Sequence, residues 1–228
     1  MKRLFIAAYT TSILAFATAP HAEPAEWTLD LGHAYVGWQV DHMTLSPTIG
    51  QFRDFDGTFL IDEDDPAKSQ ISFTVQTGSV DSNHPGRDAH LRGADYLSSA
   101  IFPEMTFTST RVQMLTPTSG KLHGDLTLNG TSAPLELDFR MVRDTHYPEF
   151  LPNYDEVRVL GFEVEGELFR LDHGIDFIAF LGSPTGLSVD LDIHFDLVDC
   201  KGAATTNIPC NWGRVAGFLG PNETAANQ

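Results

Sequence analysis

The chain has 228 residues, of which 31 are acidic and only 14 are Lys or Arg, so its formal net charge is −17. A surface this acidic disfavours nucleic acid and anionic membranes as partners, because both present negative charge. The length fits one domain of the larger all-β kind, and a hydrophobic content of 42% suffices for a core of that size.

The first 22 residues have the pattern of a secretory signal peptide. Lys2 and Arg3 precede an apolar run from Leu4 to Ala19, which is too short to span a bilayer. We expect cleavage near Ala22 and export of the remaining chain. The rest of the sequence has no second long apolar run, so no transmembrane helix is predicted.

Alternation of apolar and polar residues predicts eight β-strands after this leader. In SVDLDIHFDLV, for example, Val189, Leu191 and Ile193 alternate with charged or polar residues, so one face is buried and the other solvated. Asn129-Gly130 between two such runs predicts a tight hairpin, because both turn positions need positive φ. The predicted strands cover residues 33–43, 50–61, 69–79, 104–113, 120–129, 133–144, 157–170 and 186–198.

Eight antiparallel strands with one apolar face predict either an up-and-down barrel or a two-sheet sandwich, and periodicity alone does not choose between them. The chain has 16 phenylalanines, many of them on the predicted inner face. They would either fill the core or line an apolar cavity, since an eight-stranded barrel is about the size at which both outcomes occur.

The charged segment GRDAHLRGADYL, residues 86–97, predicts a short helical connection between the third and fourth strands. Asp88 and Arg92 are four residues apart, so we expect an ion pair between them. Leu91 and Leu97 would face the barrel. We interpret the segment as a structural cap or mouth-closing element in preference to a metal or acid–base site.

Cys200 and Cys210 follow the last predicted strand. In an oxidising compartment their spacing favours a disulfide, whereas a metal or redox site is disfavoured because no CxxC spacing or histidine-rich partner lies beside them. Composition shifts to Ala, Thr, Asn, Pro and Gly beyond Cys200, so residues 200–228 are expected to form a loosely ordered tail.

Sequence motifs for catalysis are missing: the chain has no GxSxG elbow, no HExxH and no P-loop. The histidines show no spacing that would place two imidazoles on one helix face. We therefore predict no metal site, no catalytic residue and no catalytic cofactor. His42 shares the parity of Trp38 and Val40 and should point inward, either as a hydrogen-bonded core residue or as a polar group facing a ligand.

Five segments, taken in order, resemble the YceI-like, polyisoprenoid-binding proteins. They are HAYVGWQVDHM, GQFRDFDGTFLID, GSVDSNHPGRDAHLRGADYLSSAIFPEMTF, LHGDLTLNG with PLELDF, and LGFEVEGELFRLDHGI. The resemblance implies an eight-stranded antiparallel, lipocalin-like barrel with a helical segment between strands three and four. It also implies export to the bacterial periplasm and an apolar interior that holds an isoprenoid or similar long-chain lipid, such as a quinone side chain.

Together these features divide the chain into a signal peptide (1–22), a lipid-binding barrel domain (27–199) and the tail (200–228). Strand parity and the resemblance select the expected cavity lining: Val36, Trp38, Val40, His42, Phe52, Phe59, Phe73, Val75, Leu91, Leu97, Phe107, Leu137, Phe139, Phe162, Leu191 and Ile193. Arg87 and His90 are the candidates for contacts with a ligand head group.

The leading hypothesis is an exported, non-enzymatic protein that sequesters or carries a polyisoprenoid, quinone or fatty-acid derivative. The first alternative is an enzyme-like role, or a role that presents a quinone to a membrane redox partner. The second is a structural or stress-protective domain with a filled core and no ligand. A homodimer is a further hypothesis on which the sequence does not decide.

Overall fold

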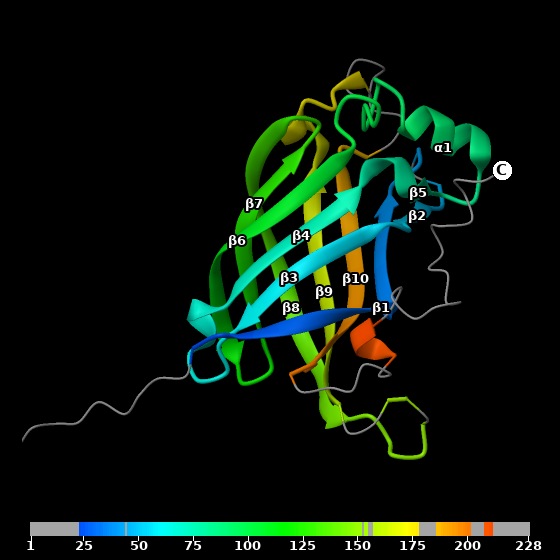
Figure 1. The fold of residues 1–228 in the computed structure, drawn as a ribbon. Helices are drawn as coiled ribbons and strands as arrows, with labels where there is room; N and C mark the ends of the chain where they lie inside the picture. Colours follow the sequence, from blue (N-terminus) through cyan, green and yellow to red (C-terminus); the bar gives the residue numbers. More distant parts are fainter. Residues whose placement is uncertain are drawn as a thin grey trace, which may run out of the picture.

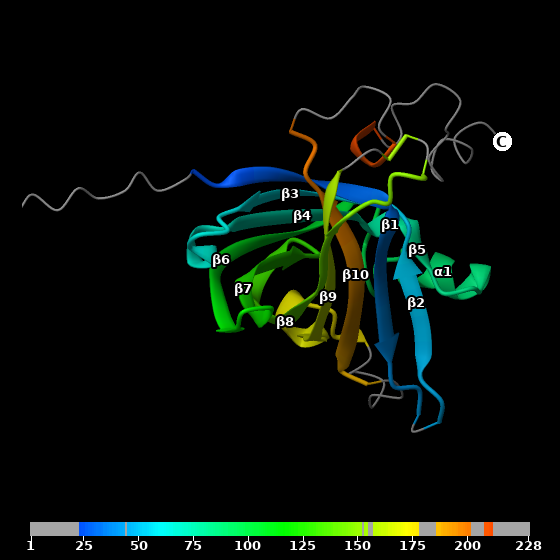
Figure 2. The same ribbon diagram turned by 90° about the horizontal axis from the view of Figure 1, so that it is seen from below.

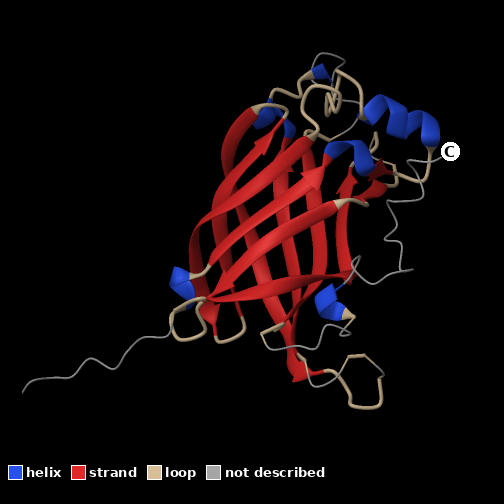
Figure 3. Ribbon diagram, viewed as in Figure 1, coloured by secondary structure: helices blue, strands red, loops and turns tan. Residues whose placement is uncertain are grey.

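A computed structural model describes residues 23–43, 45–151, 153–154, 157–177, 186–201 and 208–211. The expected signal peptide lies outside these residues. Strands dominate the described chain, with short helical segments at the ends of the sheet (Figure 3). Over the same ranges no helix is long and apolar enough to cross a membrane.

Within the described residues the sheet has ten strands, which Figure 1 labels. They are β1 (Ala25–Val40), β2 (Thr48–Phe52), β3 (Phe55–Ile61), β4 (Gln70–Gln76), β5 (Val80–Asp81), β6 (Glu104–Thr116), β7 (Ser119–Leu128), β8 (Thr131–His146), β9 (Arg158–Phe169) and β10 (Ser188–Val198). The helix α1 (Pro85–Leu91) is accompanied by the 3-10 turns η1 (Pro66–Lys68), η2 (Thr77–Ser79), η3 (Arg170–His173) and η4 (Pro209–Asn211).

Eight of these strands close into an antiparallel barrel. The order β1-β3-β4-β6-β7-β8-β9-β10 runs around the wall, and β10 pairs with β1 to complete the ring. Figure 2, seen from below, shows these strands arranged around a common interior. Closure confirms the predicted barrel and rules out the two-sheet sandwich. In the described chain β2 and β5 extend the sheet beside the second half of β1, and the sheet ends at β5.

The first strand is longer than predicted, because β1 begins at Ala25 and not at His33. Its pairing with β10 shifts register between Asp30 and Tyr35. Trp27 is buried before the shift and Trp38 after it, so odd positions face the core in the first half and even positions in the second. A bulge of this kind breaks period-2 alternation, which hides the first half of the strand from a pattern search.

The predicted strand 50–61 is two strands that meet at a corner. β2 pairs with the second half of β1, whereas β3 pairs with its first three residues. At the corner the backbone N–H groups of Arg53 and Asp54 donate to the Ser79 hydroxyl, at 3.2 and 3.1 Å. These hydrogen bonds stabilise the corner between β2 and β3.

Two further local predictions are confirmed. Asn129 and Gly130 join β7 to β8 with φ of 52° and 74°, the positive values that the hairpin requires. Cys200 and Cys210 form a disulfide with a Cα–Cα distance of 5.5 Å. The disulfide packs on a small apolar cluster that includes Val198, outside the barrel's main core. Residues 202–207 and 212–228 of the predicted tail lie outside the described residues.

Candidate ligand-binding site

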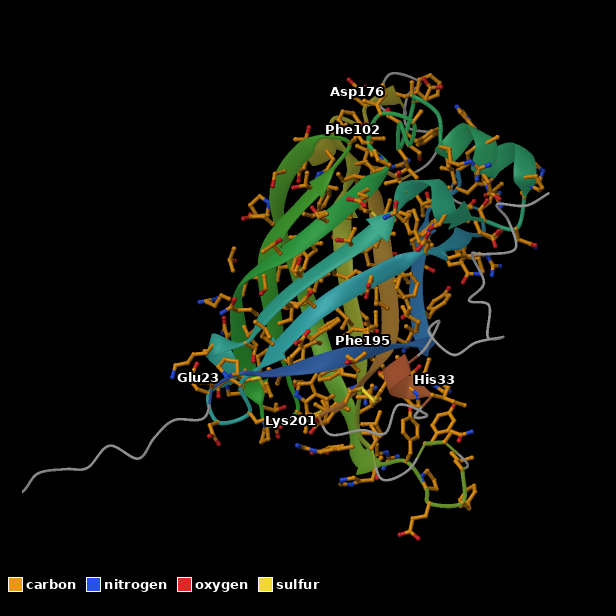
Figure 4. All side chains as sticks on the ribbon, viewed as in Figure 1. Glu23, His33, Phe102, Asp176, Phe195 and Lys201 are labelled. Carbon is orange, nitrogen blue, oxygen red and sulfur yellow. A yellow bond between two sulfur atoms is a disulfide. The ribbon has the colours of Figure 1, made fainter. Side chains whose placement is uncertain are left out.

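The barrel encloses a cavity with a volume of about 390 Å³. Apolar side chains from all eight strands of the ring line it, among them Phe195, which Figure 4 labels within the barrel. Two adjoining core clusters supply most of this lining. The phenylalanines thus surround a cavity and do not fill the interior completely.

The lining includes the predicted set apart from His42. Its members are Val36, Trp38, Val40, Phe52, Phe59, Phe73, Val75, Leu91, Leu97, Phe107, Leu137, Phe139, Phe162, Leu191 and Ile193. Period-2 alternation identified the members that lie on strands, because those strands are regular over these stretches, whereas Leu91 and Leu97 came from the predicted helical connection 86–97. Their contact with a ligand remains a prediction.

His42 does not lie in the cavity lining. The prediction assumed that the strand continues past Val40, so that His42 would point inward like Trp38 and Val40. In the structure β1 ends at Val40. The chain then turns, with the Leu45 N–H donating to the His42 carbonyl at 2.9 Å and Met43 at a φ of 52°. Strand parity carries no information beyond the end of a strand.

The helix α1 lies at one end of the barrel beside β5 and β2, as Figure 1 and Figure 2 both show. It begins with Pro85 at its first turn, and the His84 ring accepts a hydrogen bond from the Arg87 N–H at 3.1 Å as the N-cap. Leu91 and Leu97 line the cavity as expected. The segment therefore closes one end of the barrel with apolar side chains.

The ion pair predicted between Asp88 and Arg92 is wrong. Asp88 is buried, and its carboxylate accepts from the Ser82 N–H at 2.8 Å and from the Ser82 hydroxyl at 2.5 Å. The Arg92 guanidinium instead lies 3.5 Å from the Val80 carbonyl. A buried carboxylate satisfied by two local donors ties α1 to the end of β5, a tertiary contact that helical spacing does not predict.

The two candidate head-group residues lie outside the cavity lining. Arg87 is exposed and donates to the Ser82 hydroxyl at 2.7 Å and to the Ser82 carbonyl at 2.6 Å. His90 lies on the Asp95 carboxylate at 3.0 Å. Their side chains are thus engaged in holding the α1 segment together, and the structure does not bring them to the cavity.

Two polar residues that were not predicted line the cavity at the α1 end. Arg170, the first residue of η3, is only 6% exposed, and Tyr96 follows α1 in a turn. Burial lowers the pKa of Arg170 and raises that of Tyr96. Tyr96 lies in a turn after α1, where alternation gives no signal. Arg170 ends the predicted strand 157–170 and shares the parity of Phe162, but the predicted set did not include it.

Arg158 lies at the opposite end of β9 and of the cavity. Its guanidinium donates to both oxygens of Asp144 and both oxygens of Glu63, with all four distances at 2.9 Å. These bonds raise the pKa of Arg158, and the guanidinium in turn lowers the pKa of Asp144. Arg158 thus links β9 to β8 and to the segment after β3, and its single positive charge faces two carboxylates.

A polar cluster lies on the outer face of the barrel, where Asp30 and Asp196 face each other across β1 and β10. Asp30 is 1% exposed and accepts from Tyr147 Oη and His33 Nδ1, each at 2.9 Å. Burial raises the pKa of Asp196. In the part of the chain that is described, no three His, Cys, Asp or Glu residues are grouped to hold a metal ion.

The model of the YceI-like domain family matches residues 27–197. The chain belongs to the YceI family. Protein YceI of Escherichia coli O157:H7 is 38% identical over 186 residues, which cover 81% of this chain and 92% of that protein. Protein YceI of Salmonella newport is 37% identical over 195 residues, which cover 85% and 96% of the two chains.

Solved structures related to this YceI family member share its fold. Burkholderia cenocepacia BcnA aligns with a TM-score of 0.64 at 17% identity, over 74% of this chain and 98% of that chain. The Campylobacter jejuni YCEI protein aligns with a TM-score of 0.59 at 23% identity, over 70% and 89%. A polyisoprenoid binding domain from Saccharophagus degradans, implicated in plant cell wall breakdown, aligns with a TM-score of 0.52 at 13% identity, over 77% and 98%.

Proposed function

We propose that this YceI family member is an exported binding protein that holds a long-chain apolar ligand inside its barrel, such as a polyisoprenoid, a quinone or a fatty-acid derivative. The observation that carries the proposal is the cavity of about 390 Å³ with an almost wholly apolar lining. The structural similarity to a polyisoprenoid binding domain supports it. A binding protein needs no catalytic group, so the proposal does not include an enzymatic reaction.

Apolar burial alone is sufficient to give useful affinity. Each buried methylene contributes about 0.8 kcal/mol, so a chain of some fifteen to twenty carbons gains roughly 12 to 16 kcal/mol before the costs of association. Those costs are themselves several kcal/mol or more, and the surplus sets the affinity. Each additional methylene adds to the free energy of apolar burial, whereas the entropy of translation and rotation is lost only once per ligand. Long ligands are therefore favoured over short ones.

A periplasmic location is part of the proposal. Its supports are the leader-like pattern of residues 1–22 and the Cys200–Cys210 disulfide, which suits an oxidising compartment. The domain boundaries, the homodimer and the membrane redox partner remain predictions. The stress-protective alternative with a filled core is less favoured, since the interior retains a cavity.

A pair of tryptophan substitutions on neighbouring residues of β10 tests the cavity. Ile193 lines it, whereas the Asp192 side chain is 61% exposed on the other face of the strand. We expect Ile193→Trp to fill part of the interior and to weaken binding of a long-chain isoprenoid alcohol by at least about tenfold, a loss of about 1.4 kcal/mol. Asp192→Trp, the matched control, should bind like the wild type.

Titration of the delipidated proteins with the isoprenoid alcohol, followed by tryptophan fluorescence or calorimetry, measures this difference. Circular dichroism and thermal unfolding check that both variants are folded. Equal loss of binding in both variants, or no loss in a folded Ile193→Trp protein, would place the ligand elsewhere on the molecule.

A further inference from the structure

The two ends of the cavity carry different charges. β9 runs from Arg158 to Phe169, and Arg170 follows directly, so the two arginines that line the cavity are separated by the length of this strand. At a rise of about 3.3 Å per residue, this separation is about 40 Å. Figure 4 shows the same two ends, with Asp176 near Arg170 in the chain at one and Lys201 at the other.

The Arg158 end repels an anion. Its guanidinium is held by Glu63 and Asp144, and both of these carboxylates line the cavity with it. Asp62, which is buried, adds a third carboxylate to the same lining. Three acidic side chains and one basic one make this end acidic, so a negatively charged ligand group would be disfavoured there.

The Arg170 end attracts an anion. Arg170 and Tyr96 are polar residues of the described lining at this end, and they lie close enough that the positive charge of Arg170 counteracts the rise in the pKa of Tyr96 that burial causes. A guanidinium has five N–H donors in a planar fork that matches carboxylate and phosphate. In a water-poor cavity, such a cation interacts with an anion more strongly than it would in solvent.

Backbone contacts fix the position of Arg170. Its N–H donates to the Leu187 carbonyl at 3.0 Å, and its own carbonyl accepts from the Ile175 N–H at 3.1 Å. Gly174 ends the turn in the left-handed conformation, with φ of 67°. The η3 turn thus fixes the backbone of Arg170 between the end of β9 and the start of β10.

The ring of Tyr96 is also braced. It packs edge-to-face on His90 and on Phe177, with ring centroids 5.0 and 6.2 Å away. His90 is itself held by Asp95 at 3.0 Å. His90, which was predicted to contact a ligand head group, therefore packs against Tyr96, and Tyr96 lines the cavity.

We propose that Arg170 and Tyr96 bind the anionic head group of a long-chain lipid, a carboxylate or a phosphate, and that the hydrocarbon chain extends along the barrel toward Arg158. This inference rests on the proposed function and deepens it, because it assigns the chemical class of the head group and the orientation of the ligand. The acidic Arg158 end excludes the reverse orientation. Tyr96 contributes a hydroxyl donor and Arg170 a charge-assisted one.

Palmitate and hexadecanol, which have the same chain length and differ in head-group charge, test the inference. We expect the wild type to bind palmitate more tightly than hexadecanol at neutral pH. Arg170→Met, which retains length and apolar stem, should weaken palmitate binding by about tenfold or more and change hexadecanol binding by less than about threefold. Arg87→Met is the matched control, since Arg87 is an exposed arginine at the same end outside the lining, and it should leave both affinities unchanged.

Tyr96→Phe gives a second, milder variant in case Arg170→Met does not fold, and it should lower the preference for palmitate by a smaller factor. A wild type that binds both ligands equally, or an Arg170→Met protein with an unchanged preference, would overturn the head-group assignment while leaving lipid binding intact. Binding of neither palmitate nor hexadecanol by the wild type would instead contradict the proposed function itself.

Discussion

Asp196 shows how one residue outside the cavity sets a pH dependence of stability. Burial raises its pKa above the ordinary value of an aspartate carboxyl, the facing carboxylate of Asp30 raises it further, and His33 opposes both. Tyr147 also faces the pair, donating to Asp30 at 2.9 Å. Because the folded-state pKa is raised, the native protein binds this proton more tightly than the unfolded chain does.

The ionised Asp196 should therefore reduce stability at neutral pH. We expect Asp196→Asn, which removes the charge and retains the shape, to raise the free energy of unfolding at pH 7 by up to about 1 kcal/mol. The gain should shrink as the pH falls through the folded-state pKa and vanish near pH 3, where the carboxyl is protonated in both states.

Urea unfolding of the two proteins at several pH values measures this effect, with Asp192→Asn on the exposed face of the same strand as the control. A destabilised Asp196→Asn protein at neutral pH would mean that His33 stabilises the carboxylate by more than burial costs it.

The long strand β1 is the element on which closure of the barrel depends. It pairs with β10 along both halves, with β3 before the bulge and with β2 after it. The half before the bulge carries Leu29, which is 4% exposed and packs with Trp27, Phe59 and Leu160. This half is therefore part of the core and not a peripheral extension.

Leu29→Ala tests this role. Removing a buried leucine side chain should lower the free energy of unfolding by about 2 to 5 kcal/mol, because it forfeits apolar burial and leaves a cavity. Leu45→Ala provides the control at a leucine that is 68% exposed, where a change within about 0.5 kcal/mol is expected. Equal midpoints for the two variants in urea unfolding would show that the first half of β1 is not part of the cooperative core.

Regular elements could be predicted from the sequence, and irregular ones could not. β10 and the hairpin at Asn129-Gly130 follow from alternation and turn chemistry, because both signals are local. The bulge between Asp30 and Tyr35 could not be read in this way, since it reverses the parity on which the reading depends. The corner at Arg53 depends on Ser79, a tertiary contact with no local signature.

The cavity lining shows the same difference between residues in regular strands and residues outside them. Lining residues within regular strands were identified by parity, as Phe107 and Leu137 illustrate. Tyr96 was missed because it lies in a turn, where side-chain direction depends on tertiary packing. Arg170 was missed although it shares the parity of Phe162 at the end of the predicted strand 157–170. Charged side chains also invite a surface interpretation, since burial of arginine is uncommon without a specific partner or role.

At the scale of the whole molecule, charge and hydrophobicity are separated between outside and inside. The chain carries a formal net charge of −17, whereas the barrel interior is lined almost entirely by apolar side chains. An acidic exterior is repelled by anionic bilayers, and an apolar interior accepts a hydrocarbon chain. This combination suits a protein that holds a lipid away from the membrane.

Native mass spectrometry of the protein purified without detergent from a bacterial periplasm tests whether the barrel binds a lipid. We expect a mass above that of the polypeptide, and solvent extraction should release one long-chain lipid or a narrow class of them. The cavity-filling Ile193→Trp protein should lose most of this additional mass, whereas Asp192→Trp should retain it. A folded wild type that carries no additional mass, and acquires none after incubation with palmitate or a long-chain isoprenoid alcohol, would show that the barrel does not bind such lipids.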